Sequence, residues 1–376
     1  NNMAMHSFIL VTAFLAGAFA AGPSTNVDVF KAGDVVYPGT SEEKTYFCTK
    51  IPTILRTPGG DLLAWGEARV GSCADVAPTD LVMRRSTDEG ETWSELTIFQ
   101  SHGNNTSGNI APVSVPEINT IFAPFTVDNR ATWMTRSTDD GLTWSEAFEM
   151  PDMRKDDWIW VGLGPPAGLL LRSGKILIPG YHNTISMGNG SSLGSGFTKG
   201  HTMMSDDNGD SWYLGSEEFG DHYYVNELQA AQLPDDRVII NSRVLNDKRV
   251  LSISDDEGKT FKENRIADTL RQTFQGCEGS MIFHSEQNKL LYSGVQGRLP
   301  LRIYRENMTI FESVDSGDTW ELNTVVDLGS SAYSAMIEVG GDVGILYERS
   351  SCSKHGKDKC PVIFLPEAIS YRVVKL

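Results

Sequence analysis

The stretch Ser86-Thr87-Asp88-Glu89-Gly90-Glu91-Thr92-Trp93 is the first of five copies of one pattern, Ser-x-Asp-x-Gly-x-Thr/Ser-Trp/Phe. The aspartate can accept hydrogen bonds from backbone N–H groups of its own turn, and the glycine tolerates the positive φ that closes the turn. The aromatic residue leaves the turn and can pack against a neighbouring sheet. The later copies occupy residues 137–144, 205–212, 254–261 and 313–320, so successive copies start 51, 68, 49 and 59 residues apart. A hairpin tip repeated at this interval predicts a β-propeller.

The rest of the chain supports an all-β fold in a single unit. Short runs that are alternating or rich in β-branched residues recur at 51–55, 81–83, 175–178, 238–240, 290–293 and 344–347. Turn signals such as Pro58-Gly59-Gly60-Asp61 separate them. No Pro/Ser-rich linker or charge run divides the 376 residues, and no long amphipathic helix is indicated.

The charge balance limits the class of partner. The chain carries 49 acidic and 32 basic residues, a formal charge of −17, which argues against a nucleic-acid-binding surface. If the substrate is an anion, its site must therefore be a local group of basic residues in an acidic protein.

The N-terminus is typical of a secretory signal. Residues 8–20 are apolar and end in the small-x-small sequence Ala18-Phe19-Ala20, although no Lys or Arg precedes them. The run is too short to span a bilayer. We expect residues 1–21 to be a signal peptide, residues 22–376 to be the mature domain, and the protein to be secreted or lysosomal. The alternative is an ordinary N-terminal strand.

An exported protein can form disulfides. Cys48 and Cys73 flank a predicted hairpin, and Cys352 and Cys360 bracket a charged loop, so both pairs are candidates, with Cys277 left as a buried thiol. No cysteine or histidine group has metal-ligand spacing. Asn-x-Ser/Thr sequons, the acceptor pattern for glycosylation, occur at Asn104, Asn105, Asn189 and Asn307.

Several segments outside the repeats, taken in order, resemble the exo-α-sialidases (neuraminidases), whose hairpin repeats are called Asp-boxes. The segments are Lys50-Ile51-Pro52, Gly66-Glu67-Ala68-Arg69, Asp75, residues 80–86, Asn226-Glu227-Leu228-Gln229, Asn241-Ser242-Arg243, residues 305–310, Ser331-Ala332-Tyr333-Ser334 and Leu346-Tyr347-Glu348-Arg349. The resemblance runs from about residue 45 to the C-terminus. It implies a six-bladed propeller whose last blade pairs a C-terminal strand near residues 369–374 with an N-terminal strand near 27–31.

The resemblance also implies catalytic roles. Tyr333 would be the nucleophile, because a neutral phenol approaches an anionic sugar acid without the repulsion that a carboxylate meets. Glu227 would take the phenol proton, and Asp75 would act as acid and then base at the leaving oxygen. The outcome would be retention of configuration. Taken singly, Tyr333 is typical of a packed strand residue, Glu227 of a solvated turn and Asp75 of a loop cap.

Substrate binding would use cations, with one departure from the family. Arg243 and Arg305 would bind the substrate carboxylate through planar, bidentate guanidinium groups, and Arg69 would bind a ring hydroxyl. The third cation is Lys50, where the family has arginine, and Glu348 would orient it. Three hypotheses follow: weaker carboxylate binding, preference for a related 2-keto sugar acid such as a deaminated sialic acid, or binding without hydrolysis.

We therefore expect a monomeric, retaining exo-α-sialidase that releases sialic acids from glycoproteins, glycolipids or oligosaccharides, without metal or cofactor. A non-hydrolytic sialoside-binding propeller, a trans-sialidase and a generic repeat scaffold are the alternatives. Trp158 and Trp160 are either an aromatic wall for an acceptor sugar or core residues, whereas His182 and His201 are interpreted as structural.

Overall fold

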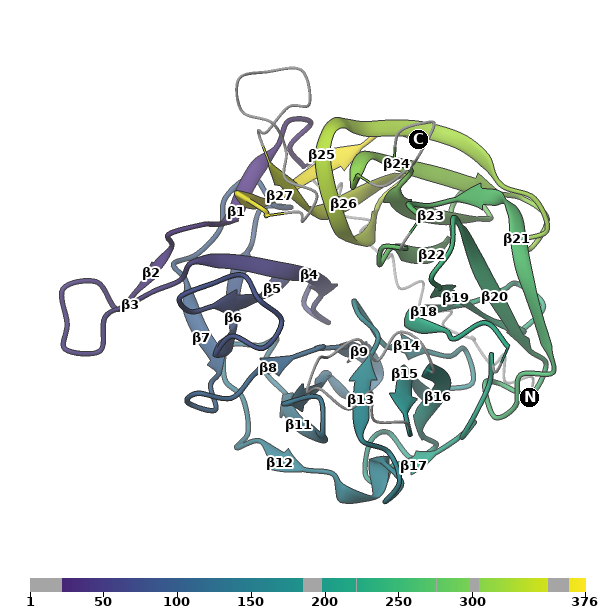
Figure 1. Cartoon of the computed structure of the whole chain (residues 1–376), viewed down its shortest axis with the longest axis horizontal. Helices are drawn as coiled ribbons and strands as arrows, with labels where there is room; N and C mark the ends of the chain where they lie inside the picture. The colour runs from purple at the N-terminus through teal and green to yellow at the C-terminus, as the bar shows by residue number, and fades with distance from the viewer. Residues whose placement is uncertain (1–21, 185–197, 221, 275, 298–303, 351–364) are drawn as a thin grey trace, which may run out of the picture.

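The computed structural model describes residues 22–184, 198–220, 222–274, 276–297, 304–350 and 365–376. The predicted signal peptide, the sequon at Asn189 and the cysteines Cys352 and Cys360 lie outside these residues. The fold is all-β, as predicted: across the described ranges the helical elements are two single 3-10 turns, Pro116–Ile118 and Pro151–Met153. The sheets stand around a common centre, and the strand Val27–Lys31 lies beside the strand Ala368–Val374 (Figure 1).

Four sheets of four or five strands follow one another along the chain. Figure 1 shows the first strands of each sheet near the centre of the ring and the last strand at its periphery. The first sheet contains β4 (Cys48–Arg56), β5 (Leu62–Arg69), β6 (Thr79–Ser86) and β7 (Thr97–Gln100). The second contains β8 (Ser107–Gly108), β9 (Val113–Val115), β10 (Thr120–Val127), β11 (Ala131–Ser137) and β12 (Phe148–Glu149). The third contains β13 (Trp160–Leu163), β14 (Leu169–Leu170), β15 (Ile176–Asn183), β16 (Thr198–Ser205) and β17 (Tyr213–Leu214), and the fourth β18 (Asn226–Gln232), β19 (Val238–Arg243), β20 (Lys248–Ser254) and β21 (Glu263–Arg271).

The last sheet has seven strands, in the order β1-β27-β26-β25-β24-β23-β22. Its strands are β22 (Ser280–His284), β23 (Lys289–Val295), β24 (Glu306–Ser313), β25 (Glu321–Val339), β26 (Asp342–Ser350), β27 (Ala368–Val374) and β1 (Val27–Lys31). The pairing of β1 with β27 confirms the predicted union of the chain ends. The six separate blades of the prediction are not seen among the described residues, because β25 runs unbroken from its pairing with β24 into its pairing with β26.

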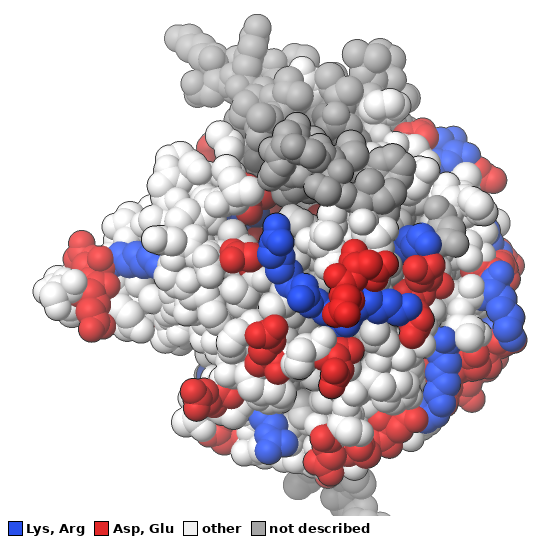
Figure 2. Space-filling view, turned by 60° about the horizontal axis from the view of Figure 1, so that its bottom comes forward, with Lys and Arg blue, Asp and Glu red and all other residues white. Residues whose placement is uncertain are grey.

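A small arm stands out from this ring. β2 (Val35–Val36) and β3 (Lys44–Thr45) form a two-stranded hairpin that projects beyond the first sheet (Figure 1). On the face shown in Figure 2, acidic and basic side chains lie next to each other rather than in areas of one sign. Within the described ranges, no helix is long and apolar enough to cross a membrane.

The five repeats have the local structure that their sequence predicts. In the first, the Ser86 hydroxyl donates to Asp88, the Gly90 amide donates to Ser86 Oγ at 2.8 Å, and the Thr92 amide donates to Asp88 Oδ1 at 2.9 Å. The same bonds recur in the other four copies. Gly90 has a φ of 87°, and a Cβ there would lie 2.2 Å from the Tyr371 ring. The repeat therefore needs glycine both for its backbone conformation and for its contact with the preceding sheet of the ring, which for Gly90 is the last sheet.

Packing between sheets forms the core. Leu63 and Trp65 of β5 pack against Ile121 and Phe125 of β10 in a cluster between the first and second sheets. In another cluster, residues of the last sheet pack against residues of the first. Because each sheet buries both faces against its neighbours, the inner strands are held at fixed positions around the centre.

Trp158 and Trp160 have different environments. Trp158 is buried and stacks on His182, with ring centroids 3.7 Å apart and planes within 6°. The Nδ1 atoms of His182 and His201 are 3.2 Å apart, so one ring donates to the other. Burial lowers the pKa of His182 to about 4 and the pKa of His201 well below its ordinary value. Trp158 is thus a core residue.

We predict that Asp139→Ala lowers the free energy of unfolding by about 1–3 kcal/mol. Asp139 accepts hydrogen bonds from the amide and the hydroxyl of Thr143 and from the Ser137 hydroxyl, and these bonds lower its pKa to about 2. Urea unfolding measures the change. Glu146→Ala, an exposed carboxylate beside the same hairpin, is the control. Equal stability of the two variants would contradict this account of the repeat.

We also predict that stability falls on mild acidification because of His182. The pKa of His182 is about 4 in the folded protein and about 6.5 in the unfolded chain. The neutral ring therefore makes its full contribution to the free energy of unfolding above pH 6.5, and this contribution is lost as the pH falls towards 4. Between pH 7.5 and 5 the loss is about 2 kcal/mol. His182→Phe keeps a ring against Trp158 but cannot titrate. Urea unfolding at both pH values should show a smaller decline for this variant, and an identical decline would contradict the assignment.

Candidate active site

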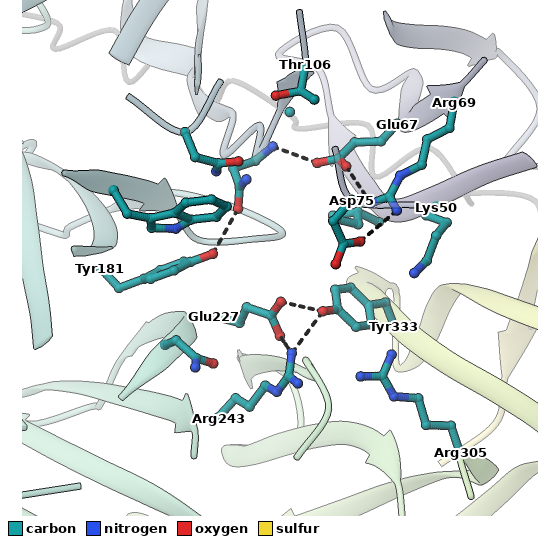
Figure 3. A pocket seen from close by; sticks show the side chains of 16 residues that line it. Lys50, Glu67, Arg69, Asp75, Thr106, Tyr181, Glu227, Arg243, Arg305 and Tyr333 are labelled. Atoms are coloured by element: carbon teal, nitrogen blue, oxygen red, sulfur yellow. Dashed lines mark hydrogen bonds and ion pairs between the residues drawn. The ribbon is translucent and has the colours of Figure 1, made fainter. Parts of the chain in front are cut away.

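A pocket opens at the centre of the ring, where strands of different sheets converge. It is lined by Lys50, Ile51, Glu67, Arg69, Asp75, Thr106, Gly108, Asn109, Asn129, Trp160, Tyr181, Asn226, Glu227, Arg243, Arg305 and Tyr333. Figure 3 shows their side chains pointing towards one shared space. The three residues predicted to be catalytic line the pocket, as do four of the five predicted to bind substrate. The fifth, Glu348, lies behind it, fully buried, where its Oε1 accepts the Ile51 amide at 2.8 Å.

Irregularities in strand pairing aim three of these side chains. The register shifts between Lys50 and Thr53, between Asn226 and Leu228, and between Ser331 and Ser334. A β-bulge leaves a residue unpaired and re-aims its side chain, and bulges of this kind cluster beside active sites. Ile51 and Glu227, which sit in two of the bulges, have φ values of 55° and 37°. Such positive φ is costly for residues other than glycine, and the surrounding sheets must hold it in place.

Tyr333, Glu227 and Arg243 form a hydrogen-bonded group across two sheets. The Tyr333 hydroxyl donates to Glu227 Oε1, while Arg243 Nη1 donates to Glu227 Oε2 at 2.5 Å and to the Tyr333 oxygen at 3.0 Å. Only 6% of Tyr333 is exposed. Burial and the Glu227 carboxylate raise the pKa of Tyr333 well above its ordinary value, against the opposing effect of Arg243 and Arg305. The phenol is therefore neutral, with its proton directed at a carboxylate.

Three cations surround this group. Arg243 contacts the Tyr333 oxygen, the Arg305 guanidinium carbon lies 5.4 Å from the centre of the Tyr333 ring, and Lys50 points into the same space (Figure 3). Burial, Arg69 and Arg305 lower the pKa of Lys50, while Glu348 and Asp75 act to raise it. The arrangement provides the local basic site that an anionic substrate would need in this acidic chain.

Asp75 stands on the other side of the pocket, held by Arg69. Arg69 Nη1 donates to Asp75 Oδ1 and to the Cys73 carbonyl, each at 2.7 Å. A disulfide joins Cys48 to Cys73, one of the two candidate pairs, with Cα atoms 5.9 Å apart, and thereby ties the Asp75 loop to β4. Partial burial acts to raise the pKa of Asp75, but Arg69, Lys50 and Arg305 outweigh it, so the pKa is lowered.

Glu67, Asn109 and Tyr181 also line the pocket, although no sequence motif had indicated a role for them. Glu67 is buried: its Oε1 accepts the Asn109 amide at 2.9 Å, its Oε2 accepts Arg69 Nη2 at 3.3 Å, and burial raises its pKa. Tyr181 donates to Asn109 Oδ1 at 3.4 Å and lies across the pocket from Asp75 (Figure 3). Glu67 precedes Arg69 by two residues, and alternate residues of a strand share a face, which is the signal that would have found it.

Of the two roles open to Trp160, the wall is the one the structure supports, since Trp160 lines the pocket. Among the described residues, no three His, Cys, Asp or Glu side chains come together as a metal site requires.

Known proteins share both the sequence pattern and the fold. The family model for the BNR repeat-like domain matches residues 60–345. The sialidase of Micromonospora viridifaciens is 26% identical over 90% of this chain and 56% of its own length, and sialidase-4 of Mus musculus is 30% identical over 64% of this chain and 55% of its own length. Among solved structures, the Hadza microbial sialidase Hz136 superposes with a TM-score of 0.72 at 23% identity, covering 88% of this chain and 66% of that one.

The chain thus spans little more than half the length of these two curated relatives. The family match nevertheless covers most of the chain, from the first sheet to β26, and includes all five repeats. The likeness to the solved structure shows a shared β-propeller fold. On this ground the chain belongs to the family of BNR repeat-like domain proteins, and the curated relatives that it resembles are sialidases.

Proposed function

We propose that this chain is a retaining exo-α-sialidase that hydrolyses terminal α-linked sialic acids of glycoconjugates. The observation that carries the proposal is the Tyr333–Glu227–Arg243 group, set among cations in one central pocket. A neutral phenol that donates to a carboxylate is the arrangement of a nucleophile with its base. The sialidases among the relatives support the same activity.

Substrate binding begins with the sugar carboxylate. Arg243 and Arg305 offer planar guanidinium forks, and Lys50 adds a point charge from β4. This anchor places the anomeric carbon, which carries the carboxylate, over Tyr333. Arg69 and Glu67 lie across the pocket, where they can bind ring hydroxyls.

The first chemical step forms a covalent sugar–tyrosine bond. Tyr333 Oη attacks the anomeric carbon and gives its proton to Glu227, while the bond to the leaving oxygen breaks and Asp75 protonates that oxygen. The cations around Asp75 hold its pKa low, so a bound substrate carboxylate, by offsetting their charge, would raise the pKa towards the range that a general acid needs.

The second step releases the sugar. Asp75 takes a proton from water, the water oxygen attacks the anomeric carbon, and the sugar–tyrosine bond breaks as Glu227 returns its proton to the tyrosine oxygen. Two inversions at one carbon retain its configuration. Glu67 and Trp160 border the pocket without a role in these proton transfers.

We also propose a number of blades, a signal peptide and an exported, monomeric state for this protein. We infer six blades, with the seven-stranded sheet counted as two blades that share β25. Residues 1–21 would be a signal peptide and residues 22–376 the mature, monomeric domain, exported to the cell exterior or to a lysosome. The Cys48–Cys73 disulfide supports export, because such bonds persist in oxidising compartments.

We predict that Tyr333→Phe lowers kcat by about 10³-fold or more, because the nucleophilic oxygen is lost. The measurement is the rate at which fluorophore is released from a fluorogenic sialoside between pH 4 and 8. Mass spectrometry after incubation with 2,3-difluorosialic acid should find a covalent adduct on Tyr333 of the wild type and none on the variant. Tyr213→Phe, outside the pocket, is the control.

Three outcomes would count against the proposal in different ways. Full activity of Tyr333→Phe would refute the nucleophile. Binding of sialosides without release by the wild type would indicate a sugar-binding propeller. Sialyl transfer to added lactose in place of hydrolysis would indicate a trans-sialidase.

We predict that Lys50→Arg lowers KM for N-acetylated sialosides by about tenfold, with little change in kcat, because a bidentate guanidinium replaces a point charge. The measurement is a panel of N-acetylated and deaminated sialosides assayed with wild type and variant. Lys50→Met, which removes the charge, should raise KM for both. A change of preferred sugar would mean that Lys50 sets specificity, and an unchanged KM would show that Lys50 does not bind the carboxylate.

A further inference from the structure

A second buried carboxylate lies behind the pocket, in a place that the mechanism does not use. Glu278 precedes β22, is 1% exposed, and does not line the pocket. Its Oε2 accepts the Ser334 amide at 2.9 Å. Because Ser334 directly follows Tyr333 in β25, this bond holds the backbone next to the proposed nucleophile.

The bond between the Ser334 amide and Glu278 takes the place of a backbone hydrogen bond to a neighbouring strand. On one side, β25 pairs with β24 up to Ser330, and on the other side Ser334 is opposite Tyr347 of β26. Beyond Ser330 the first edge is bordered by the segment around β22. There the Met336 amide donates to Ser280 Oγ at 3.0 Å, two residues along from the bond between Ser334 and Glu278. Side chains at positions 278 and 280 thus satisfy alternate amides of the inner strand, as a neighbouring strand would.

Bonds from Arg249 fix the segment that carries Glu278. Arg249 is fully buried, and its Nη1 donates to the Cys277 carbonyl at 2.5 Å while its Nε donates to Asn241 Oδ1 at 2.6 Å. Asn241 lies in β19, two residues before Arg243. The same support therefore reaches both the strand of Tyr333 and the strand of Arg243.

The environment of Glu278 favours the neutral acid. Its Oε1 has no hydrogen-bond partner within the described ranges, and a buried ionised carboxylate with one hydrogen bond is very costly. Burial raises the pKa of Glu278 well above its ordinary value, and Glu227 and Glu348 add to this, while the Ser334 amide and Arg249 oppose it.

We propose that Glu278 is a positioning residue for the reaction assigned above: it fixes Tyr333 against Glu227 by accepting the hydrogen bond of the Ser334 amide. The proposal rests on the proposed function for its effect on catalysis. It does not rest on that function for its effect on the strand, which can be measured separately.

The test compares two substitutions at one position. Glu278→Gln keeps the shape and the accepting oxygen, so kcat should stay within about twofold of wild type. Glu278→Ala leaves the Ser334 amide without a partner and frees the bulge that holds Tyr333. A misplaced nucleophile costs about 10–100-fold in kcat. KM should change less, because Lys50 lies in β4, Arg243 lies in β19 and Arg305 directly precedes β24, so none of the three belongs to β25.

Amide hydrogen exchange, followed by mass spectrometry of a peptide spanning residues 330–337, provides a readout that needs no activity. Exchange should be faster in Glu278→Ala and unchanged in Glu278→Gln. Ser280→Ala is the matched control, since it removes the acceptor of the neighbouring Met336 amide but leaves the bond to Ser334. Its kcat should fall less than that of Glu278→Ala. Circular dichroism verifies folding, and Glu278→Asp, with a shorter reach, replaces the alanine variant if that variant does not fold.

Three results would overturn the proposal. The first is a Glu278→Ala variant with the kcat and the exchange rate of the wild type. The second is a loss of kcat in Glu278→Ala without faster exchange. The third is an equal loss of kcat in Glu278→Gln and Glu278→Ala, which would mean that the charge of Glu278 is required. If the wild type lacks sialidase activity, the proposed function fails, while the exchange measurement still decides whether Glu278 holds the strand.

Discussion

The hydrogen bonds among Tyr333, Glu227 and Arg243 are the constraint on which the pocket depends. They join β25 of the last sheet to β18 and β19 of the fourth, and each partner needs the others. Arg243 and Glu227 have side chains only 14% and 13% exposed, so neither charge would be tolerated there without the other. The neutral phenol completes the group without adding a charge.

Basic and acidic side chains are also paired on the other side of the pocket. Arg69 is held between Glu67 and Asp75, and Lys50 lies near the buried Glu348. Arg243, Arg69 and Lys50 therefore each have a carboxylate behind or beside them. The pocket lining still brings four cations together in a chain of net charge −17, so local geometry, and not net charge, decides the sign that a ligand meets there.

The two ends of the sheets have different local structures. The Asp-box hairpins repeat one set of short hydrogen bonds five times and pack their glycines closely on neighbouring sheets. Each hairpin also holds one non-glycine residue at positive φ: Glu89, Asp140, Asn208, Glu257 or Ser316. At the pocket end, positive φ occurs at Ile51 and Glu227, where the strand pairing is bulged. Regular packing over most of each strand allows these costly conformations to persist where they aim side chains at the centre.

The all-β class and the hairpin repeats could be predicted from the residues alone, since a turn pattern and an alternating strand are local or periodic. The pairing of the chain ends and most of the charged residues of the pocket were predicted from the resemblance of several short motifs to one family. Which residues meet depends on the tertiary structure. It showed that Glu67 and Tyr181 face the pocket, that Trp160 lines it while Trp158 stacks on His182, and that Glu278 supports the strand of Tyr333. It also joined the last two expected sheets through β25. The physical reason is that burial, hydrogen-bond partners and local charge are set by segments far apart in the chain, and no pattern within one segment records them.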